Sequence, residues 1–349
     1  MRSIGAAALA LWLATTASAQ VPLVPPMPPG PAPSAPAAPA PAAPPATEGQ
    51  LHADHVRYDV RTRALAAEGH VILTVGDTQI RADHLTYEPD ALRVRAGGAV
   101  VVTRGEAVIQ APAVTFDVGA DTMAAAGGVR LAQAEGTLTG DALQANLRTH
   151  EVQVSGAATL THAGGPGHGA GATPTVITAP RILFHADAHE AQADGGVTLT
   201  QHDRVARAER LRYSETADRA DLDGHVVLTQ SASAAPTAPA APVKPAPPVT
   251  LACDRLAIRL VERDMQADGN VTVGRGPRSA TGDRAVYTER DHRMIVTGNA
   301  RMVDGDGSRL RADQVIISLT DDAFEGSGHV ETEFRVKRNT GHGGAPAVP

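Results

Sequence analysis

The chain has 349 residues, a formal net charge of −7 and a single cysteine, Cys253. The negative charge and the scattered Lys and Arg residues exclude a basic surface of the kind that binds nucleic acid, and one cysteine excludes an intrachain disulfide framework. Hydrophobic residues make up 42% of the chain but aromatic residues only 3%, so a core must be built mainly from Ala, Val, Leu, Ile and Met.

Residues 1–19 have the features of a secretory signal peptide. Arg2 precedes an apolar run over 4–14, and Ala17-Ser-Ala19 provides an A-x-A cleavage site before Gln20. No cysteine follows that could carry a lipid, so we expect a cleaved signal, with a retained membrane anchor as the alternative. Residues 20–50 are rich in Pro and Ala, which predicts an extended tether without a packed core.

A repeat fills residues 51–334. Each copy starts at an aliphatic residue, carries Ala-Asp two and three places later, an aromatic near the seventh place and Gly-x-Val from the eighteenth. The nine copies start at Leu51, Ile80, Ile109, Leu138, Ile177, Ala206, Leu251, Ala280 and Leu310. Because neighbouring copies of such an array stack on one another, we expect one repeat domain.

The second half of each copy predicts a bent β-strand. Apolar residues alternate, as at Leu65, Ala67, Val71 and Leu73 in the first copy, and this period of two is typical of a strand. Position 18, Gly69 in that copy, is Gly in all nine copies, and a glycine inside a strand marks a bend or a close backbone approach.

The first half of each copy predicts a second bent strand. Leu51 and Ala53 fall on one parity, whereas Val56 and Tyr58 fall on the other, and a β-bulge supplies the extra residue that this switch needs. Short polar turns between the strands favour antiparallel pairing, although a parallel solenoid would fit the same lengths. The expected fold is all-β, with a sheet folded over along a common crease around one apolar interior.

Two insertions and a tail interrupt or follow the repeats. Residues 163–175 are rich in Gly and residues 231–248 in Ala, Pro and Ser, so we expect both to leave the sheet as loops. Residues 335–349 are polar and Gly-rich, which predicts a disordered tail.

The polar side chains give no catalytic or metal-binding pattern. Carboxylates recur at position 3 of seven copies, where we interpret them as corner residues, because the third and fifth copies have Pro112 and Pro180 there. Histidines such as His70, His225 and His329 are spaced a repeat or more apart or lack partners, and no His-x-x-x-His or Cys-His ligand set is present. Cys253 occupies a small apolar position. We therefore expect no enzyme activity, no metal and no cofactor.

The aromatic residues share one position of the repeat. All four tyrosines stand at position 7, with two phenylalanines: Tyr58, Tyr87, Tyr213, Tyr287, Phe116 and Phe184. Such a row either covers the open edge of the core or grips a ligand, and the sequence leaves both interpretations open.

The repeat resembles the OstA/LptA family of lipopolysaccharide-export proteins. The resemblance rests on Ile80-Arg-Ala-Asp83-His-Leu-Thr-Tyr87 and Glu68-Gly69-His-Val71, and on their recurrence from Leu51 to about Phe334. It implies a folded-over antiparallel β-jellyroll in the periplasm that shields the acyl chains of lipopolysaccharide in an apolar groove. It also implies edge-strand pairing with inner-membrane and outer-membrane export subunits, and head-to-tail self-association.

This resemblance gives a set of expected lipid-binding residues that face the groove. They are Leu65, Val71, Leu73, Val94, Val100, Val102, Val129, Leu131, Leu160, Val197, Leu199, Val226, Leu228, Val271 and Val273. The alternatives are a secreted structural or adhesive repeat protein with a filled core and no lipid, or a periplasmic module of an inner-membrane or outer-membrane export subunit.

Overall fold

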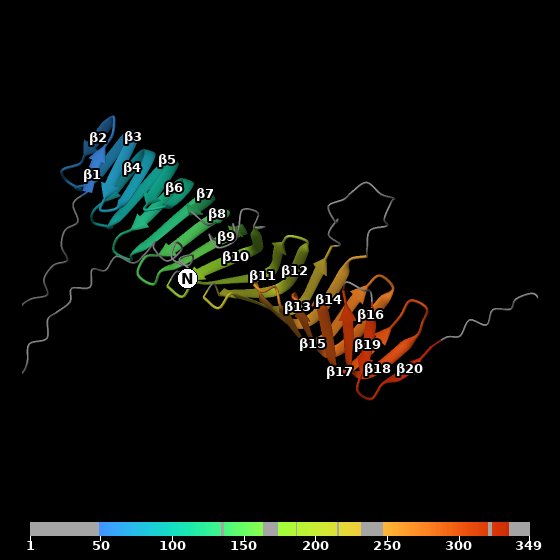
Figure 1. Ribbon diagram of the computed structural model, residues 1–349. Helices are drawn as coiled ribbons and strands as arrows, with labels where there is room; N and C mark the ends of the chain where they lie inside the picture. Colours follow the sequence, from blue (N-terminus) through green and yellow to red (C-terminus); the bar gives the residue numbers. More distant parts are fainter. Residues whose placement is uncertain are drawn as a thin grey trace, which may run out of the picture. The chain divides into compact units, whose positions relative to one another are not determined.

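The computed structural model describes residues 49–133, 136–162, 174–185, 187–214, 216–231, 247–319 and 323–334. These residues form twenty β-strands of one antiparallel sheet and no helix (Figure 1). None of the described residues belongs to a helix that is long and apolar enough to span a membrane. The expected signal peptide, almost all of the tether and of the two insertions, and the tail lie outside the described residues, and the domain boundaries stay predictions.

The chain divides into two compact units, which are described separately. Among the described residues, the N-terminal unit covers 49–133 together with 142–151, and the C-terminal unit covers 136–141 and residues from 152 onward. The strands of the N-terminal unit are β1 (Gly49–His52), β2 (His55–Tyr58), β3 (Leu65–Val75), β4 (Thr78–Glu88), β5 (Arg93–Arg104), β6 (Ala107–Asp117) and β7 (Thr122–Gln133). Strand β8 (Gly136–Asn146) contributes to both units.

The C-terminal unit holds the remaining twelve strands. They are β9 (Glu151–His162), β10 (Thr175–His185), β11 (Glu190–Gln201), β12 (Arg204–Ser214), β13 (Arg219–Gln230), β14 (Val249–Arg259), β15 (Met265–Arg275), β16 (Arg278–Thr288), β17 (Arg293–Val303), β18 (Arg309–Ser318), β19 (Phe324–Ser327) and β20 (Glu331–Glu333).

Within each unit, a strand pairs with the next strand along the chain. The ladder runs from β3 to β7 in the N-terminal unit and from β10 to β18 in the C-terminal unit, always antiparallel. This confirms the antiparallel arrangement that the short turns favoured, and it excludes the parallel solenoid.

Every long strand bends near its middle, as both halves of the repeat predicted. The pairing register shifts there, for example between Arg81 and His84 of β4. Opposite this shift, two successive residues of β5, Gly98 and Ala99, have positive φ angles of 75° and 43°. L-residues rarely adopt positive φ, and such a pair recurs at the bend of every second long strand, as in β3, β5 and β7. The aligned bends of the paired strands form one crease.

The crease has little space for side chains on the glycine at position 18. A Cβ atom added to Gly69 would lie 2.9 Å from Cβ of Asp54, the carboxylate at position 3 of the same copy. Where position 3 is Pro112 or Pro180, the residue after the glycine is itself a glycine, Gly128 or Gly196. Positions 3, 18 and 19 of one copy therefore form a single corner.

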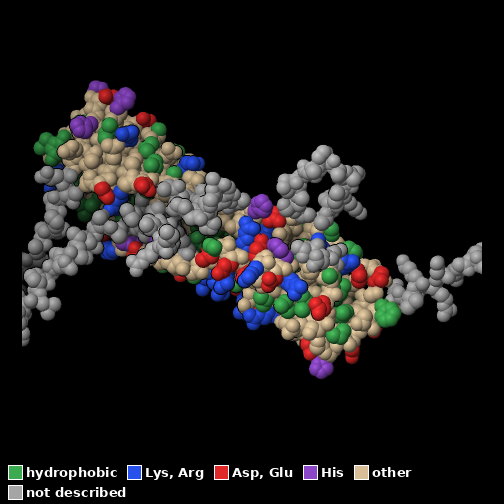
Figure 2. All heavy atoms as spheres, viewed as in Figure 1, with side chains coloured by type: hydrophobic (Ala, Val, Ile, Leu, Met, Phe, Trp, Pro, Cys, Tyr) green, Lys and Arg blue, Asp and Glu red, His purple; other side chains and the backbone are tan. Residues whose placement is uncertain are grey.

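The outer face of the C-terminal unit carries a ladder of alternating charges. Arg181, Asp194, Arg210, Asp223, Arg255, Asp268 and Arg284 stand opposite one another in successive strands from β10 to β16. Opposite charges that face each other across strands stabilise a sheet by about 0.2–1 kcal/mol per pair. Acidic and basic side chains intermingle on the visible face of this unit (Figure 2), and the ladder favours one register among similar aliphatic strands.

Candidate functional site

The crease divides the sheet of each unit into two arms. We call arm A the strand halves that end in the hairpins at 76–77, 105–106, 202–203 and 276–277, and arm B the halves that end in the turns at 89–92, 118–121 and 289–292. In both arms, alternate side chains point to one side of the sheet and are buried, as Val100 and Val102 are in arm A and Ala96 and Val114 in arm B.

The two arms cover each other's inner face. The described residues provide no helix that could cover the sheet, so only folding of the sheet upon itself can remove these side chains from water. Direct contacts between arm A and arm B of the C-terminal unit, given below, agree with this. The two arms thus enclose an aliphatic interior. We call the edge of this interior that runs along the hairpin and turn ends of the arms the lip.

All fifteen expected groove residues lie within or at the edge of this interior. Ten are buried, with at most 3% of their surface exposed: Val71, Val100, Val102, Val129, Val197, Leu199, Val226, Leu228, Val271 and Val273. The other five are half-buried: Leu65, Leu73, Val94, Leu131 and Leu160. Their contact with acyl chains stays a prediction.

The sequence-based set is one-sided, because thirteen of its fifteen residues belong to arm A. The inner face of arm B is lined by larger residues that the set omitted, among them Leu85, Met123, Leu211, Leu222 and Leu256, each at most 2% exposed. Apolar residues at positions 5, 14 and 16 of the repeat were the signal for this second wall.

The exposure of side chains varies along the lip. In the N-terminal unit, Leu65, Tyr87, Val94 and Phe116 lie near the hairpin ends of arm B and are half-buried. At the same level of arm B in the C-terminal unit, Met265, Tyr287 and Met294 are almost fully buried. Exposure varies within each unit as well, because Met123 of the N-terminal unit is 1% exposed and Phe184 and Tyr213 of the C-terminal unit are half-buried.

The exposure of the aromatic row at position 7 also varies along the chain. Tyr287 is 3% exposed and Tyr58, on the edge strand β2, is 56% exposed, whereas Tyr87, Phe116, Phe184 and Tyr213 are half-buried. The row lies at the lip and covers the interior there.

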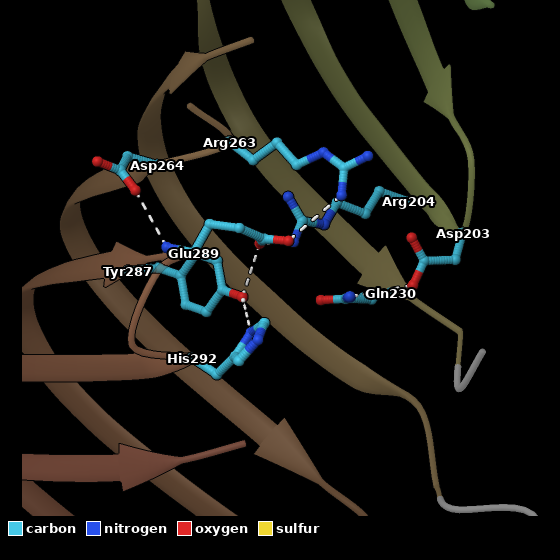
Figure 3. Close-up of polar contacts among 8 residues, drawn as sticks. All are labelled: Asp203, Arg204, Gln230, Arg263, Asp264, Tyr287, Glu289 and His292. Carbon is cyan, nitrogen blue, oxygen red and sulfur yellow. Dashed lines mark hydrogen bonds and ion pairs between the residues drawn. The ribbon is translucent and has the colours of Figure 1, made fainter. Parts of the chain in front are cut away.

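A polar cluster joins the two arms at the lip of the C-terminal unit (Figure 3). Arg204 starts β12 in arm A and points inward, and Nη2 of Arg204 lies 2.7 Å from Oε2 of Glu289, in the arm B turn after β16. The Tyr287 hydroxyl donates to the same oxygen over 2.8 Å, and Nη1 of Arg263 lies 3.3 Å from Oε1. We call Arg204, Arg263, Tyr287 and Glu289 the clasp.

The clasp is held by burial as well as by charge. Arg204, 8% exposed, is the one buried charged residue in the described part of the chain, and its guanidinium lies 5.5 Å from the centre of the Tyr287 ring, a cation–π arrangement. Burial, aided by the Glu289 carboxylate, raises the pKa of Tyr287 to about 12. Burial acts to raise the pKa of Glu289 too, but hydrogen bonds from Arg204 and Tyr287 outweigh it, and the pKa is lowered.

Two further arginines of arm A reach arm B in this unit. Nη1 of Arg275 donates to the carbonyl oxygen of Leu319 over 3.0 Å. The guanidinium of Arg278 lies 5.5 Å from the centre of the Phe324 ring. None of these contacts joins neighbouring strands, so together with the clasp they connect the arms across the interior.

Three histidines at the crease have carboxylate partners, which their spacing in the sequence did not reveal. Nδ1 of His70, His225 and His329 lies 2.8 Å from a carboxylate oxygen of Asp54, Glu209 and Asp313, respectively. Each histidine follows the crease glycine, and the left-handed turn directs its side chain toward position 3. Asn270 and Asn299 make the equivalent hydrogen bonds to Asp254 and Asp283, which supports a structural role for the acidic positions.

These pairs make stability depend on pH. The hydrogen bond and then the charge of Asp54 raise the pKa of His70, and Asp313 acts in the same way on the pKa of His329. A pKa raised by folding stabilises the fold below the unfolded value of about 6.5, and this contribution is lost as the pH rises through the folded value. We therefore expect the urea midpoint of unfolding to fall between pH 6 and pH 8.5.

The matched control replaces both histidines by the residue that other copies use. The double variant His70→Asn, His329→Asn keeps the hydrogen bonds but cannot titrate, so its midpoint is expected to fall less over the same pH range. An equal fall in both proteins would show that the pH dependence has another origin.

The remaining candidate residues carry no reactive site in the described structure. No group of three or more His, Cys, Asp or Glu residues there has the geometry to hold a metal ion. Cys253 is buried on the inner face of arm A, and burial, followed by the charges of Asp254 and Asp268, raises its pKa to about 12. A thiol with such a pKa is a poor nucleophile.

Comparison with known proteins gives one family. The family described as LptA/(LptD N-terminal domain) LPS transport protein matches residues 50–236 and 250–343. Among solved structures, the chain is similar to LptH from Pseudomonas aeruginosa, described as the LptA homologous periplasmic component of the conserved lipopolysaccharide transport device. The identity is 14% and the TM-score 0.30, over 32% of this chain and 84% of LptH. No match was found among curated proteins.

The two segments matched by the family include the start of the first repeat and the end of the last, and together they cover well over half of the chain. This confirms the resemblance seen in the repeat motif and agrees with an all-β antiparallel fold. The chain therefore belongs to the family of LptA and LptD N-terminal-domain LPS transport proteins, whose role is transport rather than catalysis.

Proposed function

We propose that this chain is a periplasmic module of lipopolysaccharide transport that holds acyl chains between its two arms. The observation that carries the proposal is the aliphatic lining of both arms: among the described residues, Arg204 is the one polar or charged residue that is buried there. Burial of a CH₂ group in such an interior is favourable by about 0.8 kcal/mol, so several acyl chains gain a large free energy of transfer from water.

The arms must separate for acyl chains to enter, because their inward side chains cover one another. In the N-terminal unit, Leu65, Leu73, Val94 and Leu131 at the lip are only half-buried, which supports entry of acyl chains there. The rival function, a structural repeat protein, would leave the arms permanently closed around a filled core.

The two ends of the ladder support docking to other modules. Among the described strands, β1 and β2 pair with β3 alone, and β19 and β20 with β18 alone. On β2, Val56 and Tyr58 are more than half exposed, as expected for a strand that lacks a neighbour. We propose that these edges pair with inner-membrane and outer-membrane export subunits or with a second copy of the chain.

Site-specific photocrosslinking tests the lipid-binding role. A benzoylphenylalanine at Leu131, half-buried and facing inward on β7, is expected to capture lipopolysaccharide in cells. The same group at the adjacent Arg130, which is exposed and faces outward, is the matched control and is expected to capture none. Absence of a lipopolysaccharide adduct at Leu131 in folded protein would contradict the proposal and favour the structural repeat.

A further inference from the structure

The clasp has the composition of an oxyanion receptor. Two guanidinium groups and one hydroxyl converge on the carboxylate of Glu289, with the contacts from Arg204 and Tyr287 at 2.7 and 2.8 Å. Charge-assisted hydrogen bonds of this kind suit a carboxylate or a phosphate equally, because both present oxygen atoms that share negative charge. The two guanidinium groups carry two positive charges, whereas the Glu289 carboxylate carries one negative charge.

The receptor lies where the polar end of an amphiphile would lie. Arg204 shares the inward-facing side of β12 with Ala206 and Ala208, which are buried in the interior. It is the outermost of the three, at the lip. An amphiphile with its chains between the arms has its headgroup at this level.

The occupant of the receptor is part of the chain itself. Glu289 belongs to arm B and Arg204 to arm A, so any separation of the arms in this region withdraws the carboxylate from Arg204. Arg204 is then left without its partner at the edge of an apolar interior, where an unpaired charge is unfavourable. An external anion that reaches the lip relieves this cost.

We propose that Arg204, Arg263 and Tyr287 bind the anionic, phosphate-bearing headgroup of an amphiphile, and that Glu289 occupies their place in the unloaded chain. This inference rests on the proposed function and adds a polar recognition site to it. The phosphate exchanges with Glu289 as acyl chains enter between the arms.

The experiment measures discrimination between two lipids. Purified full-length chain is loaded with a fluorescent acyl probe, and the probe is displaced either by lipid A or by lipid A from which the phosphates have been removed enzymatically. The ratio of the two dissociation constants is the readout, because it cancels effects on the acyl-chain site. One charge-assisted contact predicts a preference of about tenfold for phosphorylated lipid A in the unaltered chain.

The variants distinguish the anion-binding groups of Arg204, Arg263 and Tyr287 from Glu289, the internal carboxylate that occupies them. Arg204→Ala is expected to reduce the ratio to near one, and Arg263→Ala, at an exposed residue that folding tolerates, to reduce it in part. Glu289→Gln removes the internal anion and is expected to raise the ratio several-fold. Arg207→Ala, which removes the same charge from an exposed position of β12, and Asp291→Asn, in the same turn as Glu289, are expected to match the unaltered chain.

Each outcome has a definite meaning. Failure of both lipids to displace the probe from the unaltered chain would overturn the proposed function. Displacement by both lipids with a ratio that Arg204→Ala and Glu289→Gln leave unchanged would overturn this inference alone. Loss of the preference for phosphorylated lipid A in the presence of millimolar inorganic phosphate would show that free phosphate is the ligand, and would overturn the assignment to a headgroup.

Discussion

Substitution of Gly98 by Ala is expected to destabilise the N-terminal unit by roughly 3 kcal/mol. Gly98 has a φ of 75°, which an L-residue adopts at a cost of about 1 kcal/mol. The added Cβ would also lie 2.7 Å from Cβ of Asp83. Because the Cβ of Asp83 cannot rotate away, the backbone of two paired strands must move, and overpacking of this kind costs about 1–3 kcal/mol.

Urea unfolding measures this effect, and a second glycine provides the control. Gly105 also has a positive φ, 56°, but a Cβ there would meet no atom within 4 Å. Gly105→Ala is therefore expected to cost only the conformational part, about 1 kcal/mol. Equal losses for the two variants would show that the corner has room for a side chain and that the crease is not tightly packed.

Arg204→Met is expected to accelerate chemical modification of Cys253 by roughly 30-fold. The substitution leaves Glu289 inside the lip without its closest cation, and loss of one member of a buried ion pair costs several kcal/mol. We expect about 2 kcal/mol here, because the Glu289 side chain is 24% exposed, and this energy corresponds to the stated factor. Cys253 lies on the inner face of β14, between β12 and β16, the strands that the clasp connects.

The reaction of Cys253 with Ellman's reagent provides the measurement. Because Cys253 is the single thiol of the chain and is buried with a pKa near 12, it reacts only when the arms open. Arg207→Met, an exposed substitution on the same strand, is expected to leave the rate unchanged. If the Arg204 and Arg207 variants reacted at the same rate, the clasp would not control the opening of the C-terminal unit.

The bent, folded-over sheet was predictable because residues of a single repeat copy determine each corner. Gly69 and its eight equivalents mark one bend, and the parity switch after Ala53 marks the other. These signals depend on residues in one copy or in neighbouring strands, and they can be recognised because they recur in nine copies. The aliphatic residues of arm A, such as Val100 and Val102, followed from the same alternation.

The clasp was not predictable in this way. Arg204 and Glu289 are 85 residues apart, and β12, which starts at Arg204, is not a neighbour of β16, which Glu289 follows. Their meeting depends on how far arm A is displaced along arm B by the twist and tilt of the strands, which no repeat position specifies. Arg204 also stands where most other copies have an uncharged residue, such as Thr78 or Ala107, so a departure from the repeat was the available clue.

The partners of the crease histidines could have been found from the sequence. Proline at position 3 occurs together with glycine at position 19, in Pro112 with Gly128 and in Pro180 with Gly196. Such joint changes across copies indicate contact. The short spacings typical of metal ligands do not detect these histidine–carboxylate pairs, whose members are sixteen positions apart.

The corner also bears on how a chain of this kind can change its length in evolution. Because positions 3, 18 and 19 that meet at the crease come from the same copy, duplication of one 29-residue segment supplies a complete corner and a complete pair of strands. No compensating substitution in the neighbouring copies is needed at the crease. Unequal recombination can thus add or remove whole copies and alter the capacity of the interior in discrete steps.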